Sequence, residues 1–258
     1  MPLPPAILLV SHGSRDPRPQ QAVRQIAEWL STQLNDNRGD RLSHPIPVET
    51  ATLELAEEPL HRQIQRFAHR VLPLGVRQIA LLPLFLLRGT HVMEDIPAEV
   101  ELAQQALETA VEIRLYSHLG DYPGLVELWL SQMAIAPAGS RILLAHGSRR
   151  PGGNQSVEAI ATRMGAVSAF WAMEPGLETQ ICRLVQSGQS QITVLPYFLF
   201  AGSLTDAIAQ QIQDYAQRFP QSQINQAEPI GSSPALAKLI CEVLQSNTYA
   251  SSASSYSA

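Results

Sequence analysis

Two histidines and a glutamate lie where buried strands are expected to end. His12 directly follows an apolar run at residues 7–11, and Glu54 closes a second run at 48–55. His91 belongs to the loop that follows a third run. Imidazole nitrogens and a carboxylate oxygen form a mixed ligand set that suits Fe²⁺, Co²⁺, Ni²⁺ or Zn²⁺. Because these groups also exchange protons near neutral pH, the same residues are candidates for acid–base catalysis.

The three residues can meet only if the runs before them form one parallel sheet. In the first half the expected strands are 7–11, 48–55, 78–86 and 111–116, and the expected helices are 18–34, 59–72, 97–107 and 125–133. In the second half the expected strands are 141–145, 167–172, 191–200 and 223–227, and the expected helices are 155–165, 177–187, 206–219 and 234–245. This alternation predicts an α/β fold with two tandem doubly wound parallel sheets. Such sheets bind ligands at the carboxyl ends of their strands, where the candidates lie.

An internal repeat relates the two halves. His12 and His146 occur in matching segments 134 residues apart. A second pair of matching segments, 78–89 and 191–202, is offset by 113 residues. The second copy is therefore 21 residues shorter between these landmarks, and part of the difference is assigned to a polar loop at 35–47.

The repeat divides the chain into domains. We predict an N-terminal domain at 1–135 that carries the metal site and a degenerate C-terminal domain at 136–245. The Ser/Ala-rich tail at 246–258 buries too little apolar surface to order itself and is predicted to be disordered.

Composition excludes several classes of protein. The 258 residues are 45% hydrophobic, which is ample for a core. A net charge of −5 without a basic stretch argues against nucleic-acid binding. Cys182 and Cys241 are too few and too far apart for a disulfide framework or a thiolate cluster. Since neither a leader nor a long apolar segment is visible, we expect a soluble, cytoplasmic protein without membrane contacts.

Four segments carry a family resemblance. They are Ser-His-Gly-Ser-Arg at 11–15, Thr-Leu-Glu-Leu-Ala at 52–56, Leu-Pro-Leu-Phe-Leu-Leu at 82–87 and His-Val-Met-Glu-Asp-Ile-Pro at 91–97. They resemble the class II chelatases of the CbiX/SirB type, which insert a divalent metal into sirohydrochlorin. The similarity covers residues 6–245 and resembles the long form with tandem domains. The resemblance implies that His12 and His91 are the catalytic, metal-handling pair, assisted by Glu54.

The resemblance also implies the reactants. Sirohydrochlorin would be the substrate, Fe²⁺ or Co²⁺ the second substrate, and the product would serve siroheme or cobalamin biosynthesis. Neither ATP nor a tightly bound cofactor is expected, and tandem domains imply a monomer. If the imidazoles do the work, activity should fall steeply below about pH 6 as they protonate.

The substrate of such a chelatase carries many carboxylates, so an acidic protein must concentrate positive charge at the site. Ser14 and Arg15 are expected near a helix N-terminus, which favours an anion. Arginines in strand-end loops suit carboxylates because they bind them through two nitrogens. The expected substrate-binding residues are Ser14, Arg15, Arg88, Gly89, Thr90 and Arg149, with Arg18 and Arg150 nearby.

The second copy departs from the pattern. His146 is retained, but Leu204 stands where the first copy has His91, and Phe-Trp-Ala-Met at 170–173 removes the glutamate. One imidazole without its partners is a poor metal site. We therefore expect the first domain to perform the chemistry, while Trp171, Phe200 and Arg149 contact the macrocycle.

The remaining polar residues receive simpler interpretations. His61 and His69 are expected on the solvated face of a helix, His44 in a polar loop, and His118 after the fourth strand. Glu94 and Asp95 are interpreted either as groups that support the metal ligands or as the acidic first turn of the following helix, and we favour the second because acidic groups are favourable there.

Three rival functions stay open: a nickel chelatase, a protoporphyrin ferrochelatase and a non-catalytic carrier. A nickel chelatase or a protoporphyrin ferrochelatase would use the same fold, and the ligand set does not choose among Fe²⁺, Co²⁺ and Ni²⁺. A non-catalytic carrier of metal or tetrapyrrole would use the same histidines without turnover. A hydrolase with Ser11 or Ser14 as nucleophile lacks the Gly-x-Ser-x-Gly turn.

Overall fold

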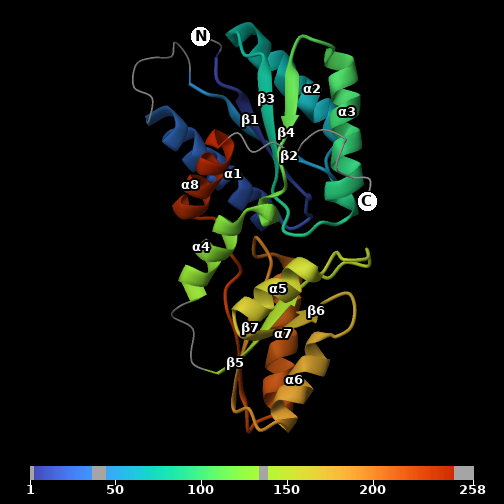
Figure 1. Ribbon diagram of the computed structural model, residues 1–258, viewed down its shortest axis with the longest axis vertical. Coiled ribbons are helices and arrows are strands. Elements are labelled where there is room, and N and C mark those ends of the chain that lie inside the picture. Colours follow the sequence, from blue (N-terminus) through green and yellow to red (C-terminus); the bar gives the residue numbers. More distant parts are fainter. Residues whose placement is uncertain (1–2, 37–44, 134–138, 247–258) are drawn as a thin grey trace. The chain divides into compact units, whose positions relative to one another are not determined.

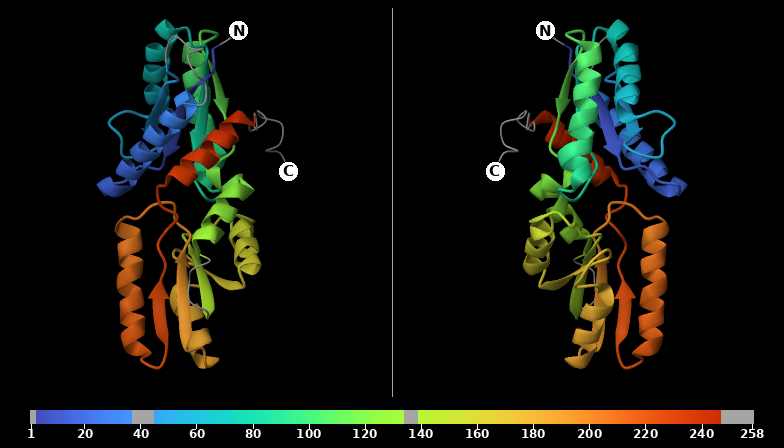
Figure 2. Two further views of the ribbon diagram at one scale, coloured as in Figure 1. Left: turned by 90° about the vertical axis from the view of Figure 1, so that its left-hand side faces the viewer. Right: turned by 90° about the vertical axis from the view of Figure 1, so that its right-hand side faces the viewer.

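The chain forms two compact units (Figures 1 and 2). The computed structural model describes residues 3–36, 45–133 and 139–246. Unit 1 contains the residues up to Tyr122 together with those from Ser232 onward, and unit 2 runs from Pro123 to Gly231. The chain therefore passes between the units twice.

The sheet of unit 1 is parallel, with strand order β2-β1-β3-β4. Its strands are β1 (Ala6–Ser11), β2 (Val48–Thr52), β3 (Gln78–Pro83) and β4 (Glu112–Leu115). Ser11 pairs with Thr52 and Val10 with Pro83, so the carboxyl ends of β1, β2 and β3 are level. The connections leaving β1 and β3 run to opposite edges of the sheet, which makes this the topological switch point.

Helices cover both faces of this sheet. Alternate residues of β1 are buried on opposite faces, as a fully covered strand requires. Ala6, Leu8 and Val10 pack with α2 (Leu60–Val71) and α3 (Ile96–Leu107). The other face is covered by α1 (Pro17–Asp36) and α8 (Pro234–Gln245), which lie side by side in Figure 1.

Unit 2 repeats this architecture with strand order β6-β5-β7-β8. Its strands are β5 (Ser140–Ala145), β6 (Ala166–Phe170), β7 (Gln191–Pro196) and β8 (Gln223–Gln226). Its helices are α4 (Pro123–Met133), α5 (Gln155–Arg163), α6 (Leu177–Gln186) and α7 (Ser203–Arg218). The two parallel sheets confirm the predicted α/β fold.

The last helix of each half belongs to the unit formed by the other half. Trp129 of α4 is fully buried with its ring centroid 5.4 Å from that of Tyr197, in unit 2. In unit 1, the Tyr116 hydroxyl donates to the carbonyl of Leu244 in α8. This division differs from the predicted boundary at 135/136. Helical periodicity identifies a buried face but does not say which sheet will cover it.

Two predicted segments fall largely outside the description. The tail at 246–258 lies outside the described residues except for Ser246, and so do residues 37–44 of the predicted polar loop. Among the strands, the predicted run at 78–86 extends past the true end of β3 at Pro83. Leu84 still donates its amide to the carbonyl of Val10, and the apolar residues after it leave the sheet although their composition continues the run.

Candidate metal and catalytic site

Within the described residues, one group of three His, Cys, Asp or Glu side chains has the geometry to hold a metal ion: His12, Glu54 and His91. Their ligand atoms all lie within 4.8 Å of one another. Nε2 of His12 is 3.8 Å from Oε2 of Glu54, and Nε2 of His91 is 3.9 Å from Oε1 of Glu54. These separations are too long for hydrogen bonds, and each is short enough for one cation to contact both atoms of the pair at about 2.1 Å.

Backbone pairing beyond the strands brings the first two ligands together. The amide of Leu53 donates to the carbonyl of Ser11, and the amide of Glu54 donates to the carbonyl of His12. Both hydrogen bonds have a donor–acceptor distance of 2.9 Å. The β1–β2 ladder thus continues for two residues after β2 ends. Glu54 is held beside His12 because of this extension.

Gly13 allows the chain to turn directly after His12. Its φ is +101°, a conformation that side chains rarely adopt. A Cβ at this position would lie 2.0 Å from the carbonyl oxygen of Glu54. Only glycine therefore permits the β1–α1 turn to pass so close to the glutamate.

The hydrogen bonds of the two imidazoles determine which nitrogens face the glutamate. Nδ1 of His91 is 2.7 Å from Oδ2 of Asp95, and Nδ1 of His12 is 3.2 Å from the carbonyl of Gly13. Both partners are acceptors, so each Nδ1 carries the proton when the ring is neutral. Both Nε2 lone pairs then point toward Glu54, as ligands to a shared cation would.

The turn that carries His91 is a π-helix, His91–Asp95, directly before α3. Of the two interpretations of Asp95, the less favoured one holds, because its carboxylate hydrogen-bonds the His91 ring. The sequence did not decide between them because a carboxylate at this position has the same sequence signature in either role.

Apolar side chains adjoin the ligands. The ring centroid of Phe85 lies 6.2 Å from that of each imidazole. Leu55 is 57% exposed beside Glu54 and has a φ of +57°. A bulky residue in this left-handed region is strained, and such strain concentrates at functional sites. The side chains of His12 and Glu54 are about half exposed, so a large ligand can reach them.

The predicted substrate-binding residues of unit 1 differ in how they are paired. Asp16 caps α1 and binds Arg18, so an acidic side chain already occupies that helix N-terminus. The hydroxyl of Ser14 accepts a hydrogen bond from the amide of Asp16. Arg88 pairs with Asp121. Arg15 is exposed and, among the described residues, forms no ion pair.

The remaining two predicted residues belong to the turn before His91. The carbonyl of Gly89 accepts the amides of Val92 and Met93. Thr90 is exposed and immediately precedes the π turn. Their backbone therefore shapes the turn that carries the histidine.

A buried histidine supports the loop between β3 and α3. His118 is 2% exposed, and its Nδ1 is 3.2 Å from Asp121, which also binds Arg88. Burial acts to raise the pKa of Asp121, but the hydrogen bond and charge of His118 and the charge of Arg88 outweigh it and hold that pKa below its usual value. The amide of Gly120 donates to the carbonyl of Phe85. Sequence reasoning missed the ion pair between Arg88 and Asp121 because the two residues are 33 positions apart in the chain.

Unit 2 keeps the backbone of the site without its ligands. The amide of Ala172 donates to the carbonyl of His146 over 3.0 Å, as Glu54 does to His12 in unit 1. Alanine therefore occupies the glutamate's place. Leu204, in the place of His91, packs against the hydrophobic core.

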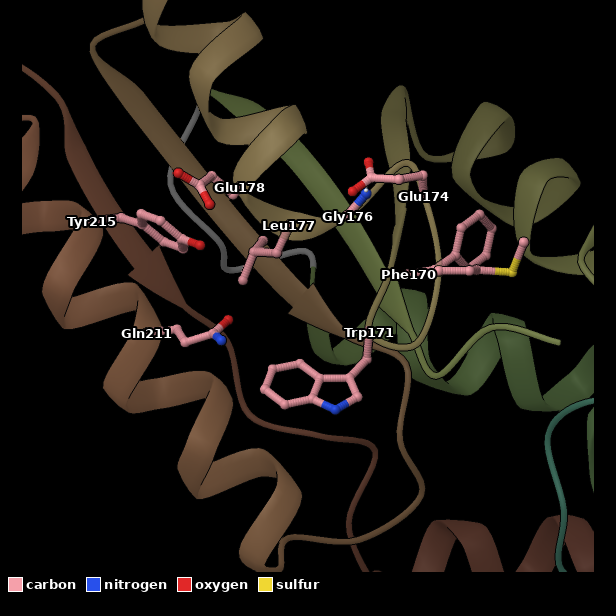
Figure 3. A pocket seen from close by; sticks show the side chains of 9 residues that line it. Phe170, Trp171, Glu174, Gly176, Leu177, Glu178, Gln211 and Tyr215 are labelled. Carbon is pink, nitrogen blue, oxygen red and sulfur yellow. Dashed lines mark hydrogen bonds between the residues drawn. The ribbon is translucent and has the colours of Figure 1, made fainter. Parts of the chain in front are cut away.

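A hollow of about 310 Å³ in unit 2 includes Trp171, which was expected to contact the substrate (Figure 3). Tyr215 faces it from α7, and the carboxylates of Glu174 and Glu178 lie on its rim. Glu178 is paired with Arg218 at 2.7 Å. Because a polycarboxylate would meet two acidic side chains here, we do not include the hollow in the candidate site.

Other histidines are as expected in part. His69 is exposed, and His44 lies outside the described residues. His61 is not simply solvated, because its Nδ1 is 2.9 Å from Oε2 of Glu99. The same carboxylate also accepts a hydrogen bond from the His61 amide, and this contact joins the start of α2 to α3.

Comparisons with known proteins agree with this geometry. A family model described as CbiX matches residues 6–136 and 140–247. A sirohydrochlorin cobaltochelatase of Priestia megaterium is 23% identical over 92% of this chain and 78% of its own length. A sirohydrochlorin ferrochelatase of the same organism is 24% identical over 83% of this chain and 81% of its own.

A solved structure shares the fold. SirB from Bacillus subtilis with Fe³⁺ has a TM-score of 0.75 and 23% sequence identity, and the match covers 95% of this chain and 96% of that one. In the described part of the chain, no helix is long and apolar enough to cross a membrane. Neither Cys182 nor Cys241 forms a disulfide within the described residues.

Proposed function

The chain belongs to the CbiX family, and from this membership we propose that it inserts Fe²⁺ or Co²⁺ into sirohydrochlorin. The single observation that carries the proposal is the cluster of His12, Glu54 and His91, whose ligand atoms face one another at the carboxyl ends of β1, β2 and β3. The names of its relatives supply the substrate: a cobaltochelatase and a ferrochelatase of sirohydrochlorin.

The ligand set suits delivery of a metal rather than its storage. Two imidazoles and one carboxylate leave coordination positions free, as in catalytic metal sites. The substrate metal would bind to the exposed cluster, and the ring nitrogens of the macrocycle would take the free positions. Insertion also releases two N–H protons from the macrocycle, and the imidazole and carboxylate groups left by the metal are able to accept them.

We assign carboxylate recognition to Arg15 and to its repeat equivalent Arg149. Both are exposed and, in the part of the chain that the structure describes, neither forms an ion pair. Arg18 and Arg88, in contrast, are already paired with acidic side chains. Free guanidinium groups would offset the net charge of −5 where the substrate binds.

Anaerobic insertion assays with sirohydrochlorin and each metal, without nucleotide, test the proposal. His12→Ala, His91→Ala and Glu54→Ala should each lower the rate by about 100-fold or more, because each removes one of the metal ligands. The matched control is His146→Ala, since His146 has the same backbone position in unit 2 without ligand partners. We expect it to change the rate by about twofold at most.

Two outcomes would contradict the proposal. If His146→Ala abolished insertion while His91→Ala did not, the chemistry would not belong to unit 1. If product never exceeded the amount of protein, the chain would be a stoichiometric carrier of metal or tetrapyrrole. A rate with Ni²⁺ above those with Fe²⁺ and Co²⁺ would reassign the metal.

We further propose a cytoplasmic monomer, for which light scattering provides the test of mass.

A further inference from the structure

We propose that Asp95 is a positioning residue that sets the tautomer and the direction of the His91 imidazole. The inference rests on the proposed function only for its consequence in metal delivery. Its structural basis is the contact between Oδ2 of Asp95 and Nδ1 of His91 at 2.7 Å, the shortest hydrogen bond that either metal-facing imidazole makes.

The contact leaves one nitrogen of His91 free. A carboxylate only accepts hydrogen bonds when it is ionised, so Nδ1 must be the protonated nitrogen of the neutral ring. Nε2, at 3.9 Å from Oε1 of Glu54, then carries the lone pair. If the proton were on Nε2 instead, the nitrogen facing Glu54 would be unable to bind a cation.

The two histidines differ in how this orientation is secured. His12 relies on a backbone carbonyl, that of Gly13, at 3.2 Å. His91 relies on a charged side chain, and a hydrogen bond to a charged acceptor is stronger than one to a neutral one. Carboxylates that hydrogen-bond metal-binding imidazoles typically change metal affinity or activity by about 10–100-fold.

The π turn is the local feature that accompanies this pair. Its amide–carbonyl bond runs from Ile96 to His91, five residues apart, where a regular α-helix spans four. In unit 2 the helix starts regularly at Ser203. From the preceding glycine to the first large buried isoleucine, unit 1 counts Gly89 to Ile96 and unit 2 counts Gly202 to Ile208, one residue fewer.

The extra residue therefore occurs in the unit that has the histidine. Where Leu204 replaces it, the helix is regular and the leucine packs against the core. A π turn of this kind often marks a functional site. The contact itself spans four residues, a spacing that a regular α-helix also brings together, so the role of Asp95 rests on the contact and not on the π turn.

The first experiment reads the tautomer in the metal-free protein. Long-range proton–nitrogen NMR correlations at about pH 8 distinguish the two neutral forms of His91, whose signals are identified by their loss in His91→Ala. The wild type should carry the proton on Nδ1. Asp95→Ala should move it substantially to Nε2. A wild-type spectrum already dominated by the Nε2–H form would overturn the proposal.

The second experiment measures Co²⁺ binding by titration without sirohydrochlorin. Asp95→Asn keeps the shape of the side chain but removes its charge, and we expect the affinity to fall at least about tenfold. Asp95→Glu, which keeps the acceptor, should recover part of the loss. The matched control, Glu101→Gln, removes one charge from an exposed residue of the same helix and should change affinity by about twofold at most.

The outcomes separate the inference from the proposed function. If Asp95→Asn and Asp95→Ala keep the wild-type tautomer and Co²⁺ affinity, Asp95 has no positioning role. If both change as expected but the wild type never metallates sirohydrochlorin, the positioning role stands and the proposed function fails. Thermal unfolding of both variants identifies a loss of fold, and an affinity loss explained by unfolding alone counts against the proposal.

Discussion

At the residue scale, the site depends on the backbone conformation of a few positions. Gly13 has no Cβ, and a Cβ at this position would lie only 2.0 Å from the carbonyl oxygen of Glu54. Leu55, the next residue after that glutamate, accepts a left-handed backbone with a φ of +57°. The ligands themselves are ordinary surface residues in type. What makes them a site is the backbone geometry that surrounds them.

Gly13→Ala should damage both stability and metal binding, because the new methyl group collides with the backbone of Glu54. The control is Gly165→Ala, where φ is also positive but no atom lies within 4 Å. The control should cost about 1–2 kcal/mol for the left-handed conformation alone. Urea unfolding and Co²⁺ titration measure the two effects. Equal losses in both variants would show that the collision is relieved cheaply.

Arg15→Gln should raise the KM for sirohydrochlorin about tenfold, the loss of one charge-assisted contact, with little change in kcat. Arg66→Gln removes the same charge from an exposed arginine of α2 that is paired with Glu58, and this change should leave the KM unchanged. Steady-state insertion kinetics make the comparison. An unchanged KM in both Arg15→Gln and Arg149→Gln would place carboxylate recognition elsewhere.

At the element scale, loops rather than strands decide the finer geometry. The extension of the β1–β2 ladder holds Glu54, and the π turn holds His91. The loop after β4 supports the loop after β3 through His118, Asp121 and Arg88. Each of these loops follows the carboxyl end of a strand, which is the side of the sheet where such folds bind ligands.

Asp121→Asn should reveal an acid-sensitive part of the stability. The folded pKa of Asp121 lies below its usual value, so its contribution is present above about pH 4 and is lost as pH falls through the folded pKa. At neutral pH the variant should lose about 1–2 kcal/mol, since buried His118 loses its partner. The deficit should shrink in acid.

Urea unfolding at a series of pH values checks this expectation. Glu112→Gln is the control, because Glu112 is an exposed carboxylate paired with Arg114 on the nearby strand β4. A deficit that stayed constant from neutral to acid pH would mean that Asp121 contributes by shape alone.

Much of the fold and part of the site follow from local patterns. The apolar run of β1 predicts a buried strand, and level strand ends predict that His12, Glu54 and His91 converge. The role of Asp95 was left between two interpretations because an acidic helix start and an imidazole partner look alike in sequence. Asp121 was missed because a long-range ion pair leaves no periodic signal.

At the scale of the whole molecule, the exchange of helices is the feature that sequence periodicity does not contain. Each half supplies its final helix to the other half's sheet, α4 to unit 2 and α8 to unit 1. The repeat in the sequence and the compact unit in space are therefore different divisions of the chain.

Truncation after Gly231 should prevent unit 1 from folding. It removes α8, whose buried residues include Leu236, Ile240 and Leu244. Each such side chain contributes about 1.5–3 kcal/mol, and a whole domain is stable by only about 5–15 kcal/mol. The control ends at Ser246 and keeps α8 whole. Limited proteolysis compares the two, and protection of residues from β1 to β4 in the shorter chain would contradict the expectation.

The same exchange constrains synthesis on the ribosome. Unit 2 is continuous from Pro123 to Gly231, whereas unit 1 needs α8, which is translated after the whole of unit 2. Domains usually fold in the order in which they emerge. Here unit 2 is able to fold before unit 1 is complete, and the cluster of His12, Glu54 and His91, though translated early, gains its complete scaffold only after α8 has emerged.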